Sequence, residues 1–192
     1  MTTVLAYVFW HWPRADVPAD AYEALQRPFH EALRGAPPGG FLGSRVLALA
    51  GAAWAAEGRD AYEDWYFVEG SAALDPLNEA AVSAPRRGAH DAAAAAAGGG
   101  TAGLYRLRRG DPGEEPHAAA WFAKPPGMSY GALFATLDPL IRSEAAALWA
   151  RQMTLGPTPE FCLQSARPVE LPAAFFPVAL RYRTVWPARG RA

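Results

Sequence analysis

Hydrophobic positions in the first half of the chain switch between two periods, and the switches mark its elements. Residues 4–12 are rich in β-branched and aromatic side chains and precede Pro13, a pattern typical of a strand. A helix follows from residue 18, with an apolar stripe at helical spacing, and Gly35 ends it. The pattern predicts further strands at 40–49, 62–69 and 101–108. A helical crossover is expected at 71–97, interrupted at 85–88 and ended by the glycine run 98–100.

The second half repeats this pattern in a shorter form. Strands are predicted at 118–124, 148–155, 160–164 and 178–186, and a helix at 130–146. The second crossover, residues 166–177, is short and rich in proline. We therefore expect it to hold only a stub of a helix.

Matched motifs occur in both halves in the same order, which indicates a duplicated folding unit. Residues 9–13 correspond to residues 121–125, Tyr22 to Tyr130 and Arg45 to Arg151. Each half then reads as a β-α-β-β-α-β unit, the ferredoxin-like arrangement. The expected division is a first unit at 1–110, a linker at 111–116, a second, shortened unit at 117–187 and a tail at 188–192.

Composition narrows the class of protein. The chain has 192 residues, of which 51% are apolar, so it can bury a substantial core. Its formal net charge of −1 gives no general attraction to nucleic acid or to an anionic membrane. Cys162 is the only cysteine, so an intramolecular disulfide is impossible and a reducing compartment fits. Without a signal-peptide pattern or a long apolar stretch, we expect a cytoplasmic protein that does not enter membranes.

Two fused β-α-β-β-α-β units with antiparallel sheets resemble the dimeric α/β-barrel superfamily. That superfamily includes small cofactor-free monooxygenases of antibiotic biosynthesis and haem-binding relatives of chlorite dismutase. The resemblance implies an α+β fold in which the two sheets meet as a barrel within one chain. It rests on the order of the elements and on the duplication rather than on a catalytic motif, so it does not fix the function.

The first strand supplies one candidate site. Because side chains alternate along a strand, Tyr7, Phe9 and His11 share one face. Trp10 and Trp12 share the other face. If the His11 face points into the barrel, His11 lies at the end of an aromatic cavity, where an imidazole suits acid–base catalysis. The alternative is a histidine at the rim, bonded to water or backbone.

Two adjacent carboxylates form the second candidate. Asp64 and Tyr66 share one face of their strand, and Glu63 and Trp65 share the other. An acidic group packed against Trp65 would have a raised pKa and could serve as a general acid or base. The alternative, which the sequence favours, is that both are solvated charges at the start of a strand.

Matched arginines form the third candidate. Arg45 and Arg151 could bind a carboxylate or enolate of a substrate through two hydrogen bonds each. The alternative, again favoured, is a structural ion pair with Glu63 or Glu160 on a neighbouring strand.

His90 is a candidate ligand of haem iron, because it lies where the crossover helix is broken. A single histidine among alanines is more often a surface residue. His30 and His117 have no evident mate, and Ser44 and Cys162 have no evident base nearby. No spaced set of metal ligands and no phosphate-binding glycine loop occurs, so we expect neither a metal centre nor a nucleotide site.

These features favour a small-molecule-binding protein of the cofactor-independent oxygenase or isomerase type. Its substrate would be largely apolar or aromatic and would lie between sheet and helices. No cofactor is expected. Two rivals stay open: a haem protein that uses His90, and a non-catalytic ligand-binding or assembly module. The expected site residues are His11 and Asp64 for catalysis and, for substrate binding, Tyr7, Trp10, Trp12, Arg45, Trp65 and Arg151.

The short second crossover also bears on assembly. A stub of helix would leave part of its sheet uncovered and would expose Phe175 and Phe176, which favours a homodimer. The alternative is that the segment folds back and buries both rings within the monomer.

Overall fold

The strands of the chain form one closed antiparallel barrel. The computed structural model describes residues 3–55, 61–153 and 156–188. Around the barrel the strand order is β1-β3-β2-β8-β5-β7-β6-β4. The strands are β1 (Val4–Pro13), β2 (Phe41–Leu49), β3 (Ala61–Glu69), β4 (Ala97–Arg109), β5 (Ala118–Phe122), β6 (Ala147–Arg151), β7 (Phe161–Ser165) and β8 (Val178–Trp186). The predicted α+β barrel is thus confirmed.

Each half of the chain contributes four neighbouring strands to the barrel. The first half gives the order β4-β1-β3-β2 and the second gives β8-β5-β7-β6, so corresponding strands occupy corresponding places. Pairing of β2 with β8 and of β4 with β6 joins the halves and closes the barrel. A duplicated unit would produce this order, although the boundaries at 110 and 116 stay predictions.

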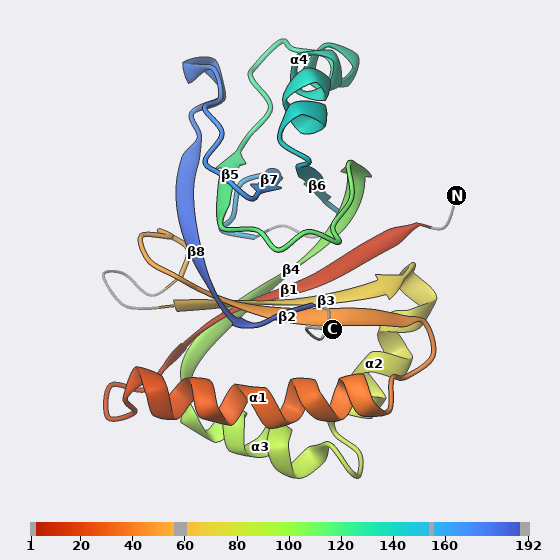
Figure 1. Cartoon of the computed structure of the whole chain (residues 1–192), viewed down its shortest axis with the longest axis vertical. Helices are drawn as coiled ribbons and strands as arrows, with labels where there is room; N and C mark the ends of the chain where they lie inside the picture. The colour runs from red at the N-terminus through yellow and green to blue at the C-terminus, as the bar shows by residue number, and fades with distance from the viewer. Residues whose placement is uncertain (1–2, 56–60, 154–155, 189–192) are drawn as a thin grey trace.

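Helices cover the outside of the barrel unequally. Three helices lie against the strands of the first half: α1 (Ala19–Gly35), α2 (Leu74–Ala81), which follows the 3₁₀ turn η1 (Ser71–Ala73), and α3 (Arg87–Ala96). Among the described residues of the second half, one α-helix, α4 (Tyr130–Ser143), covers the strands at the opposite end of the molecule (Figure 1). None of the described helices is long and apolar enough to cross a membrane.

The glycine run 98–100 lies inside β4 and does not end a helix as we had predicted. The neighbouring strand β1 requires glycine there, because a Cβ atom on Gly99 would lie 2.6 Å from the ring of Trp12. A Cβ atom on Gly100 would lie 2.5 Å from the ring of Phe9. The glycines therefore let aromatic side chains of β1 lie flat against β4.

The second crossover contains only the 3₁₀ turn η2 (Ala173–Phe175), so the expected stub is confirmed. Phe175 is buried and packs on Phe122, with ring centroids 5.4 Å apart. The expectation that Phe175 is exposed was therefore wrong, because the segment folds back over its own sheet. Phe176, in a left-handed conformation, is 82% exposed.

The residue-by-residue match between the halves is displaced on the first strand of each. Phe9, matched to Trp121 in the sequence, faces the helices, whereas Trp121 lies in the barrel interior. Trp121 pairs with Cys162 as Trp10 pairs with Glu63 in the first half. Trp121 therefore corresponds to Trp10, since a shift of one residue moves a side chain to the other face of a strand.

Aromatic side chains fill the barrel interior. The indole rings of Trp10, Trp65, Trp121 and Trp149 are buried there. Among them lies the fully buried carboxylate of Glu63. It accepts hydrogen bonds from Nε1 of Trp10 (2.9 Å), Nε1 of Trp65 (3.0 Å) and the hydroxyl of Tyr182 (2.9 Å). Because Tyr182 comes from the second half, Glu63 ties the two halves together.

Burial of Glu63 generates a prediction about stability. Burial raises the pKa of this carboxyl to about 7, outweighing the three donors that favour its charged form. Between the unfolded value near 4.5 and about 7, the folded chain binds more protons than the unfolded chain. Stability from this group therefore falls as the pH rises through that window. As the pH rises from 4.5 to 8, we expect the free energy of unfolding of Glu63→Gln to increase by about 1–3 kcal/mol relative to that of the wild type.

Urea unfolding followed by tryptophan fluorescence at several pH values measures this difference. The variant Glu79→Gln, which changes an exposed carboxylate on α2, controls for the loss of one charge. A difference between Glu63→Gln and wild type that stays constant from pH 4.5 to 8 would contradict the prediction.

Candidate functional site

A cavity of about 770 Å³ lies between the outer face of the first-half strands and the three helices that cover them. Its volume is in the range of small-molecule sites. Strands β1, β3 and β4 form its floor, and α1, α2 and α3 form its walls. Its lining residues are Tyr7, Phe9, His11, Tyr22, Gln26, Phe29, Asp64, Tyr66, Leu74, Asp75, Leu77, Asn78, Ala81, His90, Ala93, Ala94, Ala97, Gly98 and Gly99.

Alternation along β1 decides what lines this cavity. Tyr7, Phe9 and His11 face the helices and the cavity, whereas Trp10 points into the barrel. The hypothesis that His11 points into the barrel was therefore wrong about the side of the sheet. His11 does lie in an aromatic cavity, with its ring stacked on Phe9 at a centroid distance of 5.1 Å.

The polar centre of the site is the buried carboxylate of Asp64. One oxygen, Oδ1, lies 3.0 Å from Nε2 of His11. The other, Oδ2, accepts a hydrogen bond from the hydroxyl of Tyr66 (2.8 Å) and lies 3.3 Å from Nε2 of His30. The expectation that Asp64 and Glu63 are solvated charges was wrong, because both are at most 2% exposed.

The contacts of Asp64 fix the proton positions on both imidazoles. An ionised carboxylate only accepts hydrogen bonds, so Nε2 of His11 and Nε2 of His30 carry hydrogen. On neutral His11, Nδ1 is then an acceptor, and the hydroxyl of Tyr22, 2.6 Å away, donates to it. On neutral His30, Nδ1 accepts in the same way from the hydroxyl of Ser44 at 2.8 Å. Tyr22, His11 and Asp64 thus form a chain of hydrogen bonds that begins at the cavity wall.

Burial and neighbouring charges set the protonation states of the groups in this hydrogen-bonded chain. Burial raises the pKa of Asp64, but the charge that His11 and His30 carry when protonated, together with the hydrogen bonds they donate, outweighs burial and holds the pKa well below its usual value. The carboxylate therefore stays ionised at neutral pH. Burial, and then the charge of Asp64, raise the pKa values of Tyr22 and Tyr66, so both phenols stay protonated and can donate.

The tryptophans expected to line the cavity lie elsewhere. Trp10 and Trp65 fill the barrel interior, where their Nε1 atoms bond to Glu63. Trp12 lies beside Gly99, at the end of β1. Their predicted role as cavity walls fails because only alternate residues of β1 and β3 face the helices.

The two arginines also lie outside the cavity. Arg45 donates hydrogen bonds to the backbone carbonyls of Pro112 and Glu114, so it holds the linker instead of pairing with Glu63. Arg151 donates to the carbonyl of Thr158 at 2.8 Å rather than pairing with Glu160. Both guanidinium groups brace loops at the barrel, and neither lies in the lining of the cavity.

His90 on α3 does line the cavity. Its Nδ1 atom lies 3.1 Å from Oδ1 of Asp91, a contact typical of a histidine that binds a metal through its other nitrogen. In the described residues, however, no group of three His, Cys, Asp or Glu side chains is placed to hold a metal ion. The carboxylates of Asp64 and Asp75 line the same cavity as His90.

Sequence reasoning missed Tyr22, Gln26, His30, Ser44 and Tyr66. His30 was expected to have no mate and Ser44 no base, yet they contact each other and His30 contacts Asp64. One signal for these residues was present in the sequence. Tyr22, Gln26 and His30 follow one another at intervals of four on α1, which places them on one buried face.

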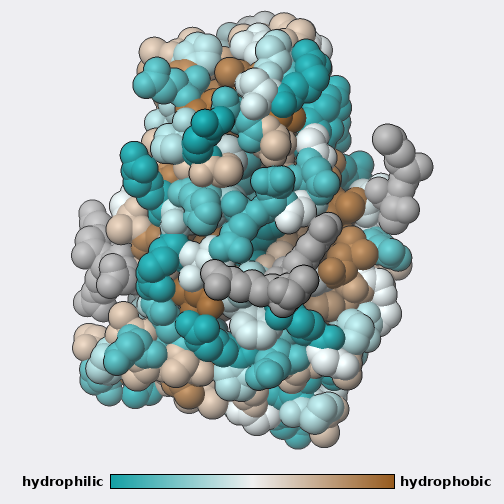
Figure 2. Space-filling view, viewed as in Figure 1, coloured by the Kyte–Doolittle hydropathy of each residue, from teal (hydrophilic) through white to brown (hydrophobic). Residues whose placement is uncertain are grey.

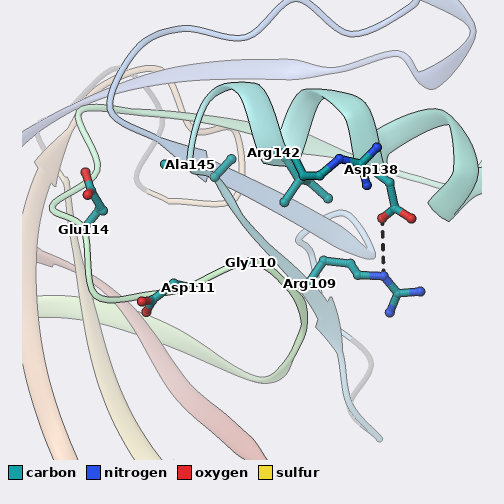
Figure 3. A pocket seen from close by; sticks show the side chains of 9 residues that line it. Arg109, Gly110, Asp111, Glu114, Asp138, Arg142 and Ala145 are labelled. Carbon is teal, nitrogen blue, oxygen red and sulfur yellow. Dashed lines mark ion pairs between the residues drawn. The ribbon is translucent and has the colours of Figure 1, made fainter.

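A second hollow, of about 450 Å³, lies beside the linker and α4. Figure 3 shows it between the end of β4 and α4, with the side chains of Arg109 and Asp138 facing each other. Nε of Arg109 lies 3.3 Å from Oδ1 of Asp138, and both side chains are partly solvated. None of the residues expected to carry chemistry lines this hollow, so we place the functional site in the larger cavity.

No protein-family model and no curated protein matches this chain. Solved structures do resemble it along nearly its whole length. A monooxygenase candidate from Fusobacterium nucleatum has a TM-score of 0.64 and 7% identity, and the match covers 96% of this chain and 93% of the other.

Two further solved structures resemble this chain along nearly its whole length. An anthrone oxidase-like protein has a TM-score of 0.53 and 10% identity, with 100% and 97% coverage. A chlorite dismutase candidate has a TM-score of 0.52 and 10% identity, with 96% coverage of both chains. At such identities the likeness defines the fold, and that fold is the dimeric α/β barrel.

Proposed function

We propose that this protein is a small-molecule enzyme of the cofactor-independent oxygenase or isomerase type. The observation that carries the proposal is the chain Tyr22–His11–Asp64, whose first member opens into a cavity of about 770 Å³. A buried imidazole held by an ionised carboxylate on one side and a phenol on the other is suited to general acid–base catalysis.

The reaction would begin with removal of a proton from an acidic hydroxyl of the substrate. The substrate proton passes to the oxygen of Tyr22 as the Tyr22 proton passes to Nδ1 of His11. The imidazolium that forms is paired with the carboxylate of Asp64, and the substrate becomes an enolate or phenolate. Such an anion can react with dioxygen, as in an oxygenase, or take back a proton at another carbon, as in an isomerase.

The cavity walls favour a flat, largely apolar substrate. Phe9, Tyr7 and Phe29 supply aromatic surface, while Ala93 and Ala94 of α3 leave space above them. The alanine-rich sequence of α3 therefore has a structural consequence, because larger side chains there would fill the cavity. The names of the similar monooxygenase and anthrone oxidase-like structures support the same class of reaction for this fold.

Haem binding at His90 is the second candidate, supported by the position of His90 in the cavity and by the chlorite dismutase candidate among the similar structures. The charges of the wall do not fit haem. Among the described residues that line the cavity there is no Lys or Arg to meet the two propionates, and Asp64 and Asp75 would oppose them. We therefore do not assign haem to this site.

Self-association as a homodimer is also proposed, now on Phe176 alone. All the described strands are paired within the chain, so a partner is not needed to complete the sheet. The face seen in Figure 2 carries only small groups of apolar residues among polar ones. Phe176, which is exposed at the end of the short crossover, is an apolar contact that a twofold dimer would bury twice.

Replacing His11 by Ala should remove the acid–base function. We use 1-hydroxy-2-acetonaphthone, whose absorbance changes on ionisation, as a probe that fits the cavity. In the wild type at pH 7 the bound probe should be more ionised than the free probe, because His11 takes up its proton, and His11→Ala should lose this increase. Oxygen uptake with the probe should fall at least about tenfold in His11→Ala, since a general base contributes a rate factor of order 10²–10⁴.

The matched control is His117→Ala, because His117 is exposed and lies outside the cavity. Equal ionisation of the bound probe in the wild type and in His11→Ala would remove His11 from the mechanism. Binding without ionisation or turnover in the wild type would favour the non-catalytic binding module.

Haem addition provides the second test. We expect no shifted Soret band when haemin is added to the purified protein, and no difference between the wild type and His90→Ala. A Soret band that is present in the wild type and lost in His90→Ala would restore the haem hypothesis.

Sedimentation tests the homodimer. At micromolar concentration we expect twice the mass of the 20.6 kDa chain, and Phe176→Glu should return the protein to the monomer. The control is Met153→Glu, which introduces the same charge at a residue that is 96% exposed. Phe134→Glu on α4 is less suitable, because Phe134 packs against a buried cluster. A wild type that sediments as a 20.6 kDa species rules out the dimer.

A further inference from the structure

We infer that His30 is a positioning residue for the acid–base chain. Through the carboxylate of Asp64 it holds His11 in place against Tyr22. The inference deepens the proposed function and rests on it. His30 is fully buried and is not among the described residues that line the cavity. It therefore acts on the reaction only through the carboxylate that it contacts.

A closed loop of hydrogen bonds that begins and ends on α1 is the first observation. The imidazole of His11, on β1, lies 2.6 Å from the hydroxyl of Tyr22 on α1 and 3.0 Å from Oδ1 of Asp64 on β3. Oδ2 of Asp64 lies 3.3 Å from Nε2 of His30, which is again on α1. Tyr22 and His30 are both buried on the inner face of this helix, about two turns apart. The loop thus ties α1 to both strands at once.

The two oxygens of Asp64 have separate partners, which is the second observation. Oδ1 faces His11, whereas Oδ2 accepts hydrogen bonds from the hydroxyl of Tyr66, at 2.8 Å, and from His30. The terminal torsion of an aspartate is broad, so donors on Oδ2 are needed to keep Oδ1 directed at His11. Tyr66 lies on the same strand as Asp64, so its bond cannot relate that strand to the helix. Of the two donors on Oδ2, His30 is the one that comes from α1.

The imidazole of His30 is itself held in place. Its Nδ1 atom accepts a hydrogen bond from the hydroxyl of Ser44 at 2.8 Å, so Nε2 carries the hydrogen that Asp64 receives. The ring stacks on Tyr66 with a centroid distance of 5.3 Å and an interplanar angle of 13°. The ring of Trp186 lies 6.3 Å away. With both nitrogens bonded and both rings packed against it, His30 gives the carboxylate a fixed donor.

Loss of this donor would affect proton transfer more than substrate binding. The cavity lining would be unchanged, because His30 is not part of it. Transfer of a proton from Tyr22 to His11 depends on the alignment of the two side chains, and small displacements of catalytic groups slow a reaction strongly. A carboxylate of Asp64 that rotates away from His11 would also stabilise the imidazolium less. We therefore expect kcat to fall while KM stays nearly constant.

Three substitutions of His30 test the inference. His30→Gln keeps a donor towards Asp64, because the amide nitrogen of glutamine reaches as far as Nε2 of histidine. His30→Asn keeps the amide but is one bond shorter, and His30→Leu has no donor. Oxygen uptake over a range of 1-hydroxy-2-acetonaphthone concentrations gives kcat and KM for each variant. We expect kcat to fall at least about tenfold in His30→Asn and His30→Leu but less than about threefold in His30→Gln, with KM constant within about twofold.

A signal in the proton NMR spectrum provides a readout that needs no substrate. The Nε2 proton of His11 is buried and bonded to an ionised carboxylate, so it should exchange slowly with water and appear at low field. Its absence from His11→Ala assigns it. We expect the signal in the wild type and in His30→Gln, and its loss through faster exchange in His30→Asn and His30→Leu. Amide signals of the same samples show whether each variant is folded, and His30→Gln and His30→Asn decide the matter if His30→Leu does not fold.

The outcomes separate the role of His30 from the proposed function. Wild-type kcat in His30→Asn and His30→Leu, together with a loss in His11→Ala, would overturn the role of His30 and leave the acid–base function intact. Equal losses in His30→Gln and His30→Asn would also overturn it, because the ring would then be needed for packing and not as a donor. If the wild type does not turn over the probe, the proposed function fails for this probe and the His11 signal decides alone. Persistence of that signal in all the folded variants would overturn the positioning role.

Discussion

Strand β3 places two buried carboxylates side by side, and the rest of the structure is arranged around them. Because neighbouring side chains on a strand point to opposite faces, Glu63 enters the barrel and Asp64 enters the space under the helices. Each carboxylate is surrounded by donors that make its burial tolerable. Inside the barrel the donors are two indoles and a phenol, which come from both halves of the chain. Outside it they are two imidazoles and a phenol.

The two networks have different consequences because only one of them meets open space. The barrel interior is filled by tryptophan rings, so Glu63 serves cohesion between the halves. Above the other face of the sheet, the first crossover forms two separate helices, α2 and α3, and α3 is built largely of alanine. The space that remains becomes the cavity at Asp64 and His11. The second half lacks a comparable crossover, and Phe175 packs directly onto its sheet.

Close contacts between β1 and β4 also help to shape the cavity. The glycines at 98–100 allow the rings of Phe9 and Trp12 to approach the neighbouring strand. Phe9 can then stack on His11 within the cavity. The glycine run 98–100 thus helps to form an aromatic wall of the cavity. The same region had the helix-ending pattern in the sequence, because glycine suits both a helix end and a close strand contact.

The sequence by itself determined the order of the helices and strands, since this order follows from the period of the hydrophobic pattern and from turn residues. The barrel was expected from the resemblance that this order carries. The sequence also identified His11 and Asp64 as candidates for catalysis. It did not determine which face of β1 meets the cavity, because both faces of that strand are apolar and aromatic. Nor did it pair His30 with Ser44 and Asp64, or place Tyr22 beside His11. These contacts join residues on α1, β1, β2 and β3 that are far apart in the chain, so only the packing of the helix against the sheet decided them.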